Sequence, residues 1–99
     1  MSDIPETVRI LGYIFNVVVL SDRPQGDCNV GSCSEYRQLI EVSPMGPDAM
    51  RETFLHEVVH ACEQGASLEL EESQIHAMSR LLYSFLRDNP AAVAWLMDR

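Results

Sequence analysis

Thr53-Phe54-Leu55-His56-Glu57-Val58-Val59-His60-Ala61 is the stretch from which the fold and the chemistry of this chain can be predicted. Residues four apart lie on one face of an α-helix, one turn from each other, so the imidazoles of His56 and His60 can reach a single ion. Glu57 lies about 100° around the same helix, where its carboxylate can reach a water beside that ion. This spacing is typical of a zinc hydrolase in which the glutamate acts as general base.

The sequence around this motif predicts helices throughout the second half of the chain. A first helix is expected from Pro47 or Asp48 to about Gln64, with proline and aspartate in its opening turn and Gly65 just after its end. A second helix is expected from about residue 69 to residue 88, and a short third helix over 91–97 after the break at Asn89-Pro90.

The second of these helices has a strong apolar periodicity. Its apolar residues recur at helical spacing, and we expect all of them to face the core: Ile75, Met78, Leu81, Leu82, Phe85 and Leu86. In the short third helix, Trp95 is expected to anchor the helix by burying its ring.

The first half of the chain is predicted to form strands. Residues 7–11 and 13–20 favour two strands with a turn near Gly12, or one bent strand, and residues 36–42 favour a further strand. Residues 21–34 are rich in Asp, Gly, Pro, Asn and Ser and are expected to form a loop. The chain is therefore predicted to be a single α+β domain over 1–99, with an antiparallel or mixed sheet of about three strands followed by two main helices and a short C-terminal helix.

The charge composition argues against nucleic acids and membranes as partners. The net charge is −8, all seven basic residues are arginine, and no basic stripe is visible. The longest apolar stretch, residues 14–20, is too short to cross a bilayer, and the acidity disfavours anionic membrane surfaces. Residues 1–6 lack the features of a signal peptide, so we expect a cytoplasmic protein with three free thiols, Cys28, Cys33 and Cys62. A disulfide or a second zinc site at Cys28 and Cys33 is the alternative.

A catalytic zinc usually has three protein ligands, so the two histidines need a partner from elsewhere. A second helix that packs antiparallel on the first would bring Glu72 opposite the histidine pair, which makes Glu72 the favoured third ligand. His76 lies four residues further on the same face and is the alternative, and Glu69 or Glu71 would need a shifted register.

Other residues near the motif have simpler interpretations beside the chemical ones. The histidine pair alone would also fit two hydrogen-bonded imidazoles on an amphipathic helix. Tyr83 shares the Glu72 face, but eleven residues at about 1.5 Å each place it about 16 Å away, so we expect it to pack rather than to react. Tyr13 and Tyr36 remain possible donors to a reaction intermediate or simple sheet residues.

Three segments together resemble a known group of proteins: 53–61, then Glu71-Glu72-Ser73-Gln74-Ile75, then 82–90. They resemble small metallopeptidase-like proteins of bacteriophages and prophages and, more distantly, the ImmA/IrrE group of zincins. In those proteins a glutamate begins a helix whose small and apolar residues recur at offsets of three, six and seven. Glu72 takes that place here, so the resemblance implies Glu72 as third ligand and a minimal zincin-like domain.

The function expected from these observations is a zinc-dependent peptidase with one Zn²⁺ per chain. His56, His60 and Glu72 are expected to bind the ion, and Glu57 to act as general base on a protein or peptide substrate. The resemblance also implies that the strand over 36–42 lies at the sheet edge and aligns an extended peptide. The alternative is a metal-stabilised structural or interaction protein, such as a phage accessory factor, without peptidase activity.

Overall fold

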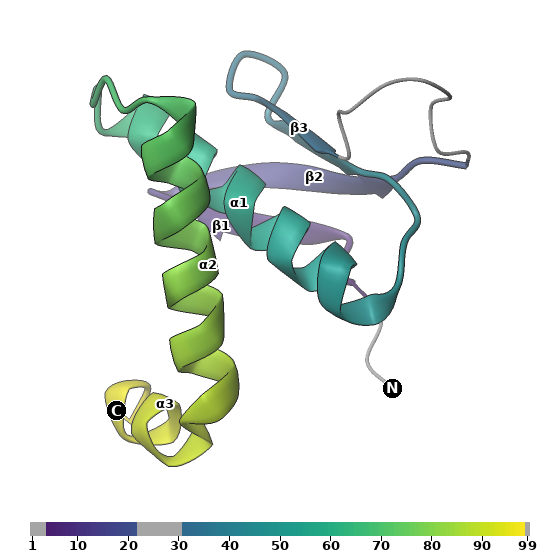
Figure 1. Ribbon diagram of the computed structural model, residues 1–99. Helices are drawn as coiled ribbons and strands as arrows, with labels where there is room; N and C mark the ends of the chain where they lie inside the picture. The colour runs from purple at the N-terminus through teal and green to yellow at the C-terminus, as the bar shows by residue number, and fades with distance from the viewer. Residues whose placement is uncertain (1–3, 22–30, 99) are drawn as a thin grey trace.

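The computed structural model describes residues 4–21 and 31–98, which form a mixed sheet followed by three helices (Figure 1). The strands are β1 (Thr7–Ile10), β2 (Tyr13–Val19), β3 (Gly31–Ser34) and β4 (Leu39–Val42). The helices are α1 (Pro47–Gly65), α2 (Glu72–Asp88) and α3 (Pro90–Leu96). The predicted α+β class, with two main helices and a short C-terminal one after the sheet, is confirmed. The sheet has four strands where about three were predicted.

The first two strands form a tight hairpin. Leu11 and Gly12 both have positive φ, 50° and 87°, as a two-residue turn that matches the twist of the flanking strands requires. The turn predicted near Gly12 is therefore confirmed. Ile10 pairs with Tyr13 next to the turn, and Phe15 and Val17 alternate into the buried face of β2.

The sheet order is β1-β2-β4-β3, with β2 and β4 parallel and the other two pairs antiparallel. Residues 31–34 were predicted as part of a loop, and this prediction is wrong. Their small polar side chains have little strand propensity, but pairing with β4, in which Cys33 lies opposite Ile40, makes them a strand. The rest of the predicted loop, 22–30, lies outside the described residues.

The strand predicted over 36–42 begins only at Leu39. Residues 35–38 form the turn between β3 and β4, Gln38 has a φ of 49°, and Tyr36 is 98% exposed. The expectation that this strand lies at the sheet edge is also wrong, because β4 pairs on both sides and β3 takes the edge position.

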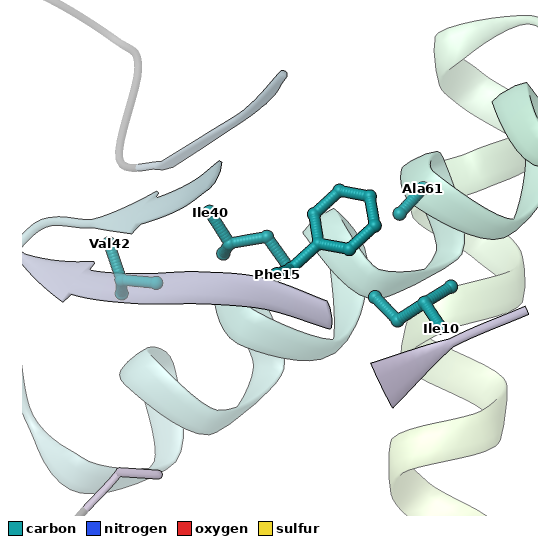
Figure 2. Packing of buried hydrophobic residues seen from close by; sticks show 5 residues of the cluster. All are labelled: Ile10, Phe15, Ile40, Val42 and Ala61. Atoms are coloured by element: carbon teal, nitrogen blue, oxygen red, sulfur yellow. The ribbon is translucent and has the colours of Figure 1, made fainter. Parts of the chain in front are cut away.

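The core lies between the sheet and one face of α1. Figure 2 shows buried side chains from β1, β2 and β4 together with Ala61 of α1, with Phe15 between Ile40 and Ala61. The buried members of this cluster are Ile10, Phe15, Ile40, Val42 and Ala61. Half-buried residues of α1 complete the contact, namely Met50, Phe54, Val58 and Cys62. One face of α1 is thereby fixed on the sheet, and another is left for α2.

The connection between α1 and α2 differs from the prediction at both ends. Gly65 is the last residue of α1, and the residue with positive φ after it is Ser67, at 57°. α2 begins at Glu72, three residues later than predicted, because Glu71 and Gln74 form a capping box: each side chain accepts a hydrogen bond from the other residue's backbone N–H.

The periodicity of α2 predicted that all of its apolar residues face the core, and this prediction is wrong. Ile75 is fully buried, but Met78, Leu81, Leu82, Phe85 and Leu86 are 37–72% exposed. Trp95 of α3 is 76% exposed and anchors nothing in the described chain. The reason is that α2 contacts α1 through a different, more polar face. None of the helices in the described residues is both long enough and apolar enough to cross a bilayer.

Truncating the side chain at the centre of the sheet tests this core. Ile40 is fully buried, so Ile40→Ala should lower the free energy of unfolding by about 2–4 kcal/mol through lost burial and a residual cavity. The matched control is Ile14→Ala in β2, where the side chain is 53% exposed and the loss should stay below about 1 kcal/mol. Urea denaturation measures both, and equal losses would show that the core is misplaced.

Candidate metal centre

The two histidines of α1 and the first residue of α2 converge on one point. The His56 Nε2 lies 2.6 Å from Glu72 Oε1, and the His60 Nε2 lies 2.9 Å from Glu72 Oε2. One ligand atom from each of the three residues lies within 4.8 Å of the others. Helix phasing brings the imidazoles to one face, and the capping box at Glu71 sets the turn of α2 that presents Glu72.

The three side chains form a site that is closed on the protein side and open on the other. The side chains of His56 and His60 are 15% and 23% exposed, whereas that of Glu72 is 68% exposed. Imidazole nitrogen and carboxylate oxygen are ligands that zinc and other divalent metals accept. Three such donors with an accessible side are the arrangement of catalytic rather than of closed structural sites.

Ser79 lies within hydrogen-bond distance of His56. Its fully buried hydroxyl donates to the backbone carbonyl of His76 at 3.0 Å, so its single hydrogen is used there. The Ser79 oxygen also lies 3.4 Å from His56 Nδ1 and would accept a hydrogen bond from an Nδ1–H there. In that tautomer the Nε2 lone pair of His56 would point toward Glu72.

This tautomer makes the triad suited to a cation. A lone pair of a neutral imidazole and a carboxylate oxygen repel each other at 2.6 Å unless a proton or a metal ion lies between them. An outer-shell hydroxyl that orients a histidine in this way is a recurring feature of metal sites. The donor set of His56, His60 and Glu72 thus fits a divalent metal ion.

Glu57 lies next to the triad in a much drier environment. It is only 6% exposed, and burial raises the pKa of its carboxyl to about 7. Positive charge on His60 acts in the opposite direction, and negative charge on Glu72 adds to the rise in pKa. A carboxyl group that exchanges its proton near neutral pH is what general-base catalysis requires.

The edge strand forms the wall next to Glu57. A Cβ built on Gly31 would lie 3.0 Å from Glu57 Oε2 and 2.8 Å from Thr53 Cγ2, so the backbone of β3 approaches α1 as closely as glycine allows. Between this wall and α2 lies a cleft of about 720 Å³. Its lining includes the triad, Glu57 and Gly31, with Glu52 and His76 at the rim.

The other candidate ligands do not join the triad. His76 has its ring centre 6.0 Å from that of His56 and is exposed at the rim of the cleft. Glu71 is used in the capping box, and Glu69 lies in the exposed segment before α2. Among the described residues, the group that can hold a metal contains Glu72 and none of these three.

The tyrosines lie away from the cleft. Tyr83 donates a hydrogen bond to Asp48 Oδ1 at 3.0 Å and so links α2 to the start of α1, in agreement with its predicted packing role. Tyr36 is exposed in the β3–β4 turn, and Tyr13 lines a different cavity beside Gly65. Neither is placed to donate to a reacting group at the triad.

Two of the three cysteines fall in the described residues, and both are free. Cys33 was expected in a loop but lies in β3, where burial, together with the charge of Glu57, raises its pKa to about 11. Cys62 packs against the core, as its place on the apolar side of α1 predicted. Cys28 lies outside the described residues.

The sequence analysis missed Gly31 and the role of Ser79 toward His56. Ser79 lies seven residues after Glu72, hence on the same helix face, and this spacing is a signal that could have revealed it. Gly31 could not be found in this way, because its segment had no predicted strand and no spacing that links it to α1.

Substitution of Gly31 tests the close approach of β3 to Glu57. Gly31→Ala should cost about 1–3 kcal/mol of stability, since Thr53 or Glu57 must move to admit the methyl group. Gly46→Ala is the comparison, because nothing lies within 4 Å of its added Cβ; since Gly46 is the N-cap of α1, the loss should be at most about 1 kcal/mol and smaller than for Gly31→Ala. Thermal denaturation measures the stability of both variants. A Gly31→Ala variant as stable as the wild type would contradict the close approach of Gly31 to Thr53 and Glu57.

Comparison with protein-family models, with curated proteins and with solved structures finds no match to this chain. The case for its chemistry therefore rests on the geometry of His56, Glu57, His60 and Glu72.

Proposed function

We propose that this chain is a zinc-dependent peptidase in which His56, His60 and Glu72 hold the metal ion. The observation that carries the proposal is the convergence of Glu72 from α2 on both histidines of α1, with the buried Glu57 beside them. When bound, a divalent ion supplies Lewis acidity, which lowers the pKa of water toward neutrality and polarises a substrate carbonyl.

The protein's own residues have separate roles in this proposal. Ser79 keeps the Nε2 lone pair of His56 directed at the ion. Glu57 takes a proton from water at its carboxylate and passes it to the leaving amine, a role for which its pKa of about 7 is suited. Burial also restricts the movement of this carboxylate, which keeps it beside the triad.

The substrate we propose is an extended peptide. In the described sheet β3 pairs only with β4, so its other edge has backbone groups available for a further strand. Gly31 at the start of β3 adjoins Glu57, so a peptide on this edge would pass close to the base. The resemblance to small phage zincins adds to this proposal, and the free thiols of Cys33 and Cys62 fit a reducing cytoplasm.

The second candidate is a metal-stabilised interaction protein without peptidase activity. The observation that favours it is the exposed apolar surface of α2 and α3, which is suited to binding another protein. The two candidates share the metal site and differ in whether Glu57 acts on a substrate.

Metal analysis tests the site itself. Protein purified without added metal should contain about one zinc ion per chain, because the triad supplies three ligands. His60→Ala should weaken zinc binding by at least about 100-fold, since it removes a direct ligand. His76→Ala is the control, and it should change affinity less than about 5-fold because His76 lies outside the triad. Competition with a chelating dye measures these affinities, and equal effects would favour His76 as a ligand.

Glu57→Gln tests the chemistry separately from the metal. The amide keeps the shape of the side chain but cannot take a proton, so hydrolysis of a broad peptide library should fall by about 10²–10⁴-fold. Zinc content should stay unchanged, and the melting temperature should not fall because a buried carboxylate is replaced by a neutral group.

The wild-type result in the same library separates the two candidate functions. Hydrolysis that depends on both zinc and Glu57 supports the peptidase. A protein that binds zinc tightly and cuts no peptide would overturn it and leave the interaction protein.

A further inference from the structure

The arm formed by α2 and α3, residues 72–97, carries an apolar surface that the described part of the chain leaves uncovered. We call the α2 part the apolar stripe, and it consists of Met78, Leu81, Leu82, Phe85 and Leu86. The exposed fractions range from 37% for Leu86 to 72% for Leu81. The end of the arm adds Trp95, Leu96 and Met97, each more than half exposed.

The apolar stripe is not the face through which α2 contacts α1. That contact is made by polar residues that recur at helical spacing: Glu72, Ser79, Arg80, Tyr83 and Arg87. Leu82 and Phe85 each follow a member of this set by two residues, and two residues span about 200° around a helix. Met78, Leu81 and Phe85 therefore face away from α1, whereas Leu86, seven residues after Ser79, lies where the stripe borders the contact face.

The arm also extends beyond the rest of the fold. Among the described elements α2 contacts only α1 and α3, and α3 contacts only α2. Figure 1 shows α2 running past α1, with α3 at the end farthest from the sheet. No described strand or helix is in a position to cover the stripe.

The exposed apolar area of the arm reaches the size of a stable interface only when both of its parts are counted. At about 200 Å² for a fully exposed large side chain, the five residues of the stripe present on the order of 500 Å² and the three at the end of the arm on the order of 400 Å². Specific protein interfaces bury about 800 Å² on each partner, whereas the largest apolar patch of a typical monomer is about 300–600 Å².

The charge of the arm favours a partner surface that is itself close to neutral. Residues 72–99 contain three acidic residues and three arginines, whereas residues 1–71 contain twelve acidic residues and four arginines. The net charge of −8 thus lies entirely outside the C-terminal segment. Arg80 and Arg87 are already paired with Glu52 and Asp48 of α1, so the arm offers little to a strongly charged partner or to anionic lipid.

We propose that the occupant of the apolar stripe is a second copy of this chain. Two copies that meet along their neutral arms avoid the repulsion between their acidic N-terminal regions. A two-fold axis brings the same surface of both copies together, so that each stripe meets the stripe of its partner. The proposal is independent of the peptidase function, because no residue of the stripe belongs to the metal centre.

Sedimentation equilibrium on the full chain, over about 1–100 µM, tests this association. The wild type should reach twice the monomer mass of 11.2 kDa. Leu81→Glu places a charge at the most exposed position of the stripe and should weaken dimerisation by at least about 100-fold, since the charge would be buried without a partner. Ser73→Glu adds the same charge at an exposed position nine residues before Leu82, about 180° around α2 from it, and should change dimerisation less than about 3-fold.

The remaining outcomes are each decisive. Circular dichroism verifies that Leu81→Glu is folded, and Leu82→Gln, which adds no charge, gives a second test of the stripe. A wild type that stays monomeric at the highest concentration overturns the proposal. A dimer that both stripe variants leave intact also overturns it, because the interface then lies elsewhere. A monomer that sediments with phosphatidylcholine vesicles would identify the stripe as a lipid-binding surface instead.

Discussion

The packing of α1 against both the sheet and α2 determines most of this structure. One face of the helix packs Ala61, Phe54 and Val58 against the sheet, and the adjacent face presents His56 and His60 to α2. Glu57 lies between these two faces and is buried by the edge strand. A helix that is shared in this way cannot rotate without losing either the core or the triad, so the same packing that stabilises the domain also fixes the geometry of the candidate site.

The stability of the domain and the reactivity of the site oppose each other at Glu57. Burial raises the pKa of this carboxyl because a charge is poorly solvated there, and the fold bears that cost. Ser79 is the opposite case: it is fully buried, but its hydroxyl has a partner in the His76 carbonyl and another in His56. The site thus contains one poorly solvated carboxyl, that of Glu57, and one buried hydroxyl with hydrogen-bond partners, that of Ser79. Local departures from good solvation are common at functional sites.

Local signals in the sequence were sufficient to predict the helices and the first hairpin, and to select His56, Glu57 and His60 as candidate site residues. Proline and aspartate at the start of α1 and the positive-φ turn at Gly12 act within a few residues, so their effects can be read directly. The convergence of Glu72 on the histidines was also anticipated, because two long helices joined by a short connection must pack antiparallel. The start of α2 was misplaced by three residues, since a glutamate can cap a helix or occupy its first turn and only the partner residue, Gln74, decides between them.

The pairing of strands that are distant in sequence could not be predicted from the sequence. β3 forms because it pairs with β4, and the residues Gly31-Ser32-Cys33-Ser34 have no pattern from which this pairing could be predicted. The periodicity of α2 correctly showed an amphipathic helix but could not show what its apolar side packs against. The expectation that this side belongs to the core assumed that one chain supplies every partner, and in the described residues it does not.

The separation in sequence of the triad has a consequence for how the chain folds. His56 and Glu72 are sixteen residues apart, whereas the parallel pair of β2 and β4 brings Asn16 to Leu39, across a longer segment. Closing the shorter loop loses less chain entropy, and contacts between neighbouring helices form early. If a metal ion binds the α1–α2 hairpin at that stage, it would give the hairpin stability before the sheet is complete. In that case the metal-bound hairpin would form before the strands pack against α1.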